Sequence, residues 1–127
     1  MSEYVITSLR QPPWRLDAGE FVARIQQQWP GARTEIGAAD APMAANALIP
    51  FSAPRRELGV ALDQLGFAVI LEPADPDTAT EFVMWYLQYL PAFAPEVRLI
   101  TEDYDKSMPL HPETTADEIR ALLEGPR

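Results

Sequence analysis

The clearest run of apolar positions covers residues 78–90, where the chain reads TATEFVMWYLQYL. Apolar residues recur there every three or four positions, which is the spacing of a helix with a buried face. The stripe consists of Ala79, Phe82, Val83, Tyr86, Leu87 and Leu90. Trp85 and Tyr89 widen it, and we expect both to pack against a neighbouring helix. The positions left for solvent are Thr80, Glu81, Met84 and Gln88. The pattern predicts a core helix that needs cover on two faces.

Two signals compete for the start of this helix. Asp75 can cap it with Pro76 in the first helical position, or Thr78 and Glu81 can form a capping box slightly later. Pro91 predicts its end, because the residue before a proline is disfavoured in helical conformation.

Capping signals predict two further helices. Asp17 and Glu20 form a capping box, and the helix that they open is predicted to stop at Pro30. Thr115 and Glu118 form the same arrangement at the start of a last helix, over residues 114–123. Both segments carry an apolar stripe at helical spacing.

Segments rich in β-branched and apolar residues predict the strands. Residues 3–9 are apolar on both faces, which is typical of an inner strand. Residues 57–63 alternate apolar and polar positions, and residues 67–71 are continuously apolar, so the two predict a hairpin. We expect 67–71 to lie in the middle of the sheet with both faces covered. Residues 33–36 and 97–101 are predicted as short strands.

Small residues and prolines shape the remaining segments. Residues 37–45, GAADAPMAA, predict a loop. Residues 47–51 resemble a strand, but Pro50 cannot donate to a sheet ladder, so we expect an edge strand or a bulge. The sequence as a whole predicts one domain over residues 1–127 with an α+β fold. We expect a mostly antiparallel sheet of five or six strands, with two or three helices and the 78–90 helix packed on its face.

Acidic residues outnumber basic ones by 19 to 10, which gives a net charge of -9. Residues 64–127 hold twelve acidic and four basic side chains, so this half carries most of the charge. A field of that sign repels phosphate backbones, and nucleic-acid binding is therefore not expected. A basic protein is the natural partner. A second interpretation stays open, in which the acidity only keeps the protein soluble.

The chain contains no cysteine, so disulfides and thiolate metal sites are excluded. This composition fits a reducing compartment, and we expect a cytoplasmic protein. No apolar stretch approaches the roughly 20 residues that a membrane helix needs, and no membrane association is expected. Phosphate-binding, dinucleotide-binding, hydrolase and zinc motifs do not occur. We therefore expect no cofactor and no enzymatic activity. The absence of these motifs favours a binding protein.

An acidic segment with one aromatic residue is the first candidate for a contact with a partner. It comprises Glu102, Asp103, Tyr104 and Asp105. A tyrosine framed by carboxylates can anchor in a pocket while the charges pair with surrounding Arg and Lys. Equally, Tyr104 can fold back on the core and leave the acids solvated. The second candidate surface is Asp75, Asp77 and Glu81.

Two other functions stay open from the residues alone. Asp103, Asp105 and His111 could form a small acid-base or metal site if they converge. A small acidic secretion chaperone would instead present an apolar groove and form a dimer. The oligomeric state, monomer or dimer, is not fixed by the sequence.

The layout of the chain resembles that of small bacterial immunity proteins, which are encoded beside polymorphic toxins. The resemblance lies in Trp29-Pro30-Gly31-Ala32, in Phe82-x-x-Trp85-Tyr86 followed by Pro91, in Asp103-x-x-Lys106, and in Thr114-Thr115-x-x-Glu118-Ile119. It implies a cytoplasmic protein that binds one cognate toxin domain without a cofactor and blocks its active site. No individual functional residue is implied, because such proteins vary most where they bind.

Overall fold

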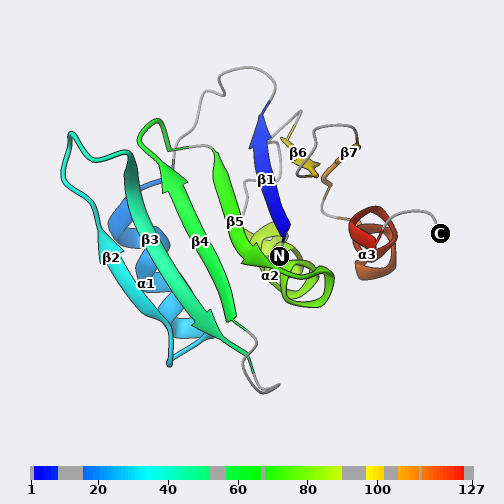
Figure 1. Ribbon diagram of the computed structural model, residues 1–127, viewed down its shortest axis with the longest axis horizontal. Coiled ribbons are helices and arrows are strands. Elements are labelled where there is room, and N and C mark those ends of the chain that lie inside the picture. Colours follow the sequence, from blue (N-terminus) through cyan, green and yellow to red (C-terminus); the bar gives the residue numbers. More distant parts are fainter. Residues whose placement is uncertain are drawn as a thin grey trace.

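Seven strands form one antiparallel sheet in the order β2-β3-β4-β5-β1-β6-β7 (Figure 1). The computed structural model describes residues 2–8, 16–51, 57–66, 68–89, 97–101, 106–111 and 113–124. The strands are β1 (Ser2–Ser8), β2 (Arg33–Ile36), β3 (Met43–Pro50), β4 (Glu57–Asp63), β5 (Val69–Ala74), β6 (Val97–Ile100) and β7 (Ser107–Pro109). The helices are α1 (Ala18–Gln28), α2 (Pro76–Tyr89) and α3 (Ala116–Glu124). The predicted α+β class is confirmed, with one strand more than the upper estimate.

The strands β2 to β5 form a meander, and β1 is inserted between β5 and β6. Both pairings of β1 are antiparallel, so the first strand of the chain is an inner strand, as predicted. The hairpin of β4 and β5 is confirmed, and Gly66 closes its turn with a φ of 83°. The side chain of Asp63 also accepts hydrogen bonds from the N–H groups of Gly66 and Ala68 in this turn.

Two sequence-based expectations about the sheet are wrong. Residues 43–45 belong to β3 rather than to a loop, because they pair with the end of β4. β3 lies inside the sheet rather than at its edge, and its register shift falls between Met43 and Ala45 rather than at Pro50. Pro50 is tolerated because it is the last residue of the strand. The sequence made no prediction for the short apolar segment around Met108, which forms the edge strand β7 and pairs with β6.

Alternate residues of the strands face the helices and form the core. They include Tyr4, Ile6, Ala45, Ala47, Ile49, Leu58, Val60, Leu62, Val69, Leu71, Val97 and Leu99, which are all buried. α1 packs on β2 and β3, α2 packs on β4 and β5, and α3 packs on α2. The second cover that the pattern of α2 requires is therefore α3.

The helices begin where their capping residues predict. The N–H of Thr78 donates to Asp75 Oδ1 at 2.9 Å, so α2 uses the earlier of its two start signals. Thr80 was expected in solvent but is buried, and its hydroxyl donates to the carbonyl of Pro76 at 2.6 Å. That hydrogen bond satisfies the hydroxyl, which makes its burial tolerable.

The predicted Asp17 cap of α1 and the predicted capping box of α3 are confirmed. The N–H of Glu20 donates to Asp17 Oδ2 at 2.9 Å. Thr115 and Glu118 bond reciprocally. The Thr115 N–H donates to Glu118 Oε1 at 2.9 Å, and the Glu118 N–H donates to Thr115 Oγ1 at 3.2 Å. Donation by the backbone N–H and the hydroxyl of Thr115 lowers the pKa of the Glu118 carboxyl, because these bonds favour its charged form.

Gly59 in β4 is a position where only glycine fits. A Cβ added there would overlap the carbonyl oxygen of Glu72 and lie 2.9 Å from Pro73 Cδ on β5. We therefore expect Gly59→Ala to lower the free energy of unfolding by about 1–3 kcal/mol, because the β5 backbone has to move. Urea unfolding measures this change. Gly19→Ala is the control, since its Cβ would meet only the exposed Asp17 carboxylate at 3.3 Å, and a cost as large as that of Gly59→Ala would contradict the assignment.

Candidate interaction surfaces

One face of the sheet carries no helix in the described part of the chain. α1 and α2 lie behind the strands in Figure 1, and α3 does not overlap the strands in that view. We expected both faces of β5 to be covered, and the described residues cover one of them. Ile70 and Glu72 lie on the other face, half-buried and exposed respectively.

A single cross-strand row runs over this open face from one edge of the sheet to the other. Register pairs connect, in order, Glu35, Asn46, Ala61, Ile70, Val5, Ile100 and Ser107. The four central members are apolar and half-buried, and the members at the ends are polar. This row thus has an apolar centre and polar ends, an arrangement that resembles the apolar core and polar rim of a protein interface.

Charged residues of the strands lie on the open face. The acidic ones are Glu3, Glu35, Glu57, Asp63 and Glu72, and the basic ones are Arg33 and Arg98. Arg33 lies 3.6 Å from the carboxylate of Glu57, and Arg98 donates to the hydroxyl of Ser107 at 2.9 Å. These arginines belong to β2 and β6, so the strands β3, β4, β5 and β1 contribute acidic residues and no basic residue to the described part of the face.

A hollow of about 450 Å³ lies in this face over β3, β4 and β5. Gly59 and Ala61 form its floor, since neither has a side chain beyond a methyl group. Leu48 and Ile70 are among the apolar residues that line it, and Glu3 and Glu72 are its acidic lining residues. The hollow combines an apolar floor with acidic groups.

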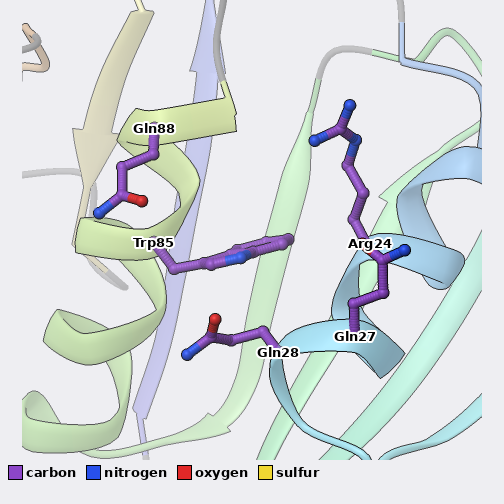
Figure 2. A pocket seen from close by; sticks show the side chains of 5 residues that line it. All are labelled: Arg24, Gln27, Gln28, Trp85 and Gln88. Carbon is purple, nitrogen blue, oxygen red and sulfur yellow. The ribbon is translucent and has the colours of Figure 1, made fainter.

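A second hollow, of about 250 Å³, lies on the helix side between α1 and α2. Figure 2 shows the Trp85 side chain reaching from α2 toward α1, with Gln28 of α1 extending beside it. The second hollow is also lined by Arg24, Gln27 and Gln88. Arg24 Nε donates to Glu20 Oε1 at 3.0 Å. The polar groups that the second hollow offers are therefore side-chain amides of glutamine rather than acid-base groups.

Trp85 belongs to an aromatic cluster that joins the two helices. Its ring centroid lies 5.2 Å from that of Trp29, at the end of α1, and 5.4 Å from that of Phe82. Phe82 stacks in turn on Trp29 and on Tyr86. The prediction that Trp85 packs against a neighbouring helix is confirmed, whereas the Tyr89 side chain lies outside the described part of the chain.

The second candidate contact surface is partly used inside the molecule. Asp75 caps α2, and Asp77 Oδ1 lies 3.3 Å from Arg120 Nε of α3. Glu81 is exposed on α2. Asp75 and Asp77 thus have structural roles, and their contact with a partner stays a prediction.

The first candidate surface, Glu102, Asp103, Tyr104 and Asp105, lies outside the described residues. The acid-base alternative shares two of these residues, so their distance from His111 is not described either. His111 is exposed, and its backbone N–H donates to Thr114 Oγ1 at 2.8 Å. Within the described ranges, no three His, Cys, Asp or Glu side chains gather as they would around a metal ion.

Comparison with known protein families, with curated proteins and with solved structures found no match. Among the described helices, none combines the length and the apolar character needed to cross a membrane.

Sequence reasoning did not identify the open face or its hollow. The alternation in residues 57–63 indicated one wet face, and that face carries the small residues Gly59 and Ala61. The small size of Gly59 and Ala61 was the signal in the sequence from which the hollow could have been predicted. Glu3 and Glu72 are 69 positions apart, and only the pairing of β1 with β5 brings them together.

Trp85→Ala tests whether the aromatic cluster supports the fold. We expect the free energy of unfolding to fall by about 2 kcal/mol, because a half-buried indole loses its contacts with Trp29 and Phe82. Thermal or urea unfolding measures the loss. Gln88→Ala removes a neighbouring exposed residue of the same groove and should be near neutral, so equal effects would contradict a structural role that is specific to Trp85.

Proposed function

We propose that this protein is a non-catalytic acidic binding protein, an immunity protein that neutralises a cognate bacterial toxin domain by covering its active site. It would act in the cytoplasm and needs no cofactor. The observation that carries the proposal is the open sheet face, with its apolar row and its central acidic residues. The net charge of -9 supports a partner with a basic surface.

The size of the open face supports a protein partner. Seven strands at a spacing of about 4.8 Å give a face about 30 Å wide. With strands of about 15–20 Å, its area is on the order of 500 Å², a large part of the about 800 Å² that each partner contributes to a standard interface. The acidic segment 102–105 and the α2 residue Glu81 stay candidates for additional contacts.

The physical basis of neutralisation is occlusion. Half-buried Val5, Ile70 and Ile100 lose their remaining contact with water when a partner covers them, which favours binding. The carboxylates around them attract a basic surface and speed its association. A toxin domain whose active site is basic would therefore be blocked without any chemical step.

Capture and growth experiments test this function together. The tagged protein is used to retrieve its partner from a lysate of its own host, and the partner is then expressed without this chain. We expect growth arrest by the partner alone and normal growth when both proteins are expressed, with equimolar complex formation in light scattering. A harmless partner would reject the proposal, and retention of many unfolded segments would favour the chaperone alternative.

Ala61→Arg tests the use of the sheet face. It places a long cation in the centre of the apolar row, so the dissociation constant for the captured partner should rise about tenfold or more. Ala23→Arg is the matched control, because it makes the same change at an exposed position of α1. Calorimetry should show less than about twofold change for the control. An equal effect of both variants would indicate a general charge effect and contradict the role of this face.

A further inference from the structure

We propose that the hollow in the open sheet face binds an arginine side chain of the protein partner, with Glu3 and Glu72 holding its guanidinium group. The inference rests on the proposed function for the existence of that partner. The chemistry of the hollow can nevertheless be tested with a peptide alone.

The position of the two carboxylates is the first step of the argument. The register of β1 against β5 shifts between Ser2 and Tyr4, which pair with Ala74 and Leu71. Glu3 therefore lies opposite the segment of Glu72 and Pro73. Like charges that face each other across two strands repel, and a bound cation removes that repulsion. No ion pair of either carboxylate is present among the described residues.

The floor of the hollow suits the rest of an arginine side chain. The carbonyl of Glu72 approaches β4 so closely that residue 59 has no room for a Cβ, which leaves bare backbone at Gly59. Ala61 and Ile70 continue the floor as half-buried apolar residues. An arginine places its aliphatic stem on apolar surface and its charged head at carboxylates, and this hollow offers both.

The hollow favours arginine over other cations. Its volume of about 450 Å³ exceeds what a bare metal ion fills, and its carboxylates number two where hard cations take six or more oxygen ligands. A guanidinium group is planar, less strongly hydrated than an ammonium group and able to bond two carboxylates at once. Asn46 on β3 supplies a further polar group in the lining.

A peptide titration tests the inference directly. Hexa-arginine is added to the full-length protein at low salt, and backbone amide shifts are followed by NMR. We expect saturable shifts at Ala61, Ile70 and Glu72, and no comparable shifts with hexa-citrulline, which keeps the shape but lacks the charge. Added salt should weaken the binding.

Two double variants separate the hollow from the general acidity of the protein. Glu3→Gln with Glu72→Gln should raise the dissociation constant for hexa-arginine about fivefold or more. Glu113→Gln with Glu124→Gln removes the same charge from exposed positions just before α3 and at its end, and should change it less than about twofold. Unfolding curves confirm that both variants fold.

The outcomes distinguish this inference from the proposed function. Equal weakening in both variants, or shifts that concentrate on the helix side, would overturn the arginine site. If that happens while the captured partner still arrests growth and is neutralised, the inhibitor function stands and only the site is wrong. If the hollow binds hexa-arginine specifically but the partner proves harmless, the site stands and the immunity function is wrong.

Discussion

The packing of α2 is the interaction on which the rest of the structure depends. This helix covers β4 and β5, supports α3 on another side, and meets the end of α1 through the stacked rings of Phe82 and Trp29. Phe82, Val83 and Tyr86 are fully buried. The aromatic cluster therefore holds together helices that come from distant parts of the chain. Without α2, α1 would lie on β2 and β3 alone and α3 would lose the surface on which it packs.

Placing the helices on one side leaves the strands with two chemically different faces. The helix side of the strands is almost entirely apolar, whereas their charged residues lie on the other side. Half-buried Val5, Ile70 and Ile100 interrupt that polar face, although a fully solvated face has no need of them. Their position in one cross-strand row, next to Glu72, gives the face the mixture of apolar and acidic groups on which the proposed function rests. Gly59 connects this surface to the fold, because the close approach of β5 that excludes a side chain there also forms the floor of the hollow.

Local signals in the sequence were sufficient to predict the helices. Strand pairing determined the parts of the sheet that these signals did not predict. The caps at Asp17, Asp75 and Thr115 depend on neighbours three residues away, so sequence spacing predicted them. Residues 43–45 looked like a loop because small residues have little strand preference, yet pairing with β4 makes them a strand. The hollow depends on the register of β1, β4 and β5 together, which no local pattern contains. The acidic segment 102–105 was chosen for its charge, and it lies outside the described residues.

The insertion of β1 between β5 and β6 has a consequence for how the protein is made. Val5 pairs with Ile70 on one side and with Ile100 on the other, so β1 leaves the ribosome before either of the strands with which it pairs. Contacts of such sequence separation slow folding, because a long loop must close before they form. Until then, β1 is an apolar strand with both edges unpaired, and it is exposed to other chains. The sheet can therefore close around β1 only after Ile100 has left the ribosome, and the nascent chain is most prone to aggregation before that point.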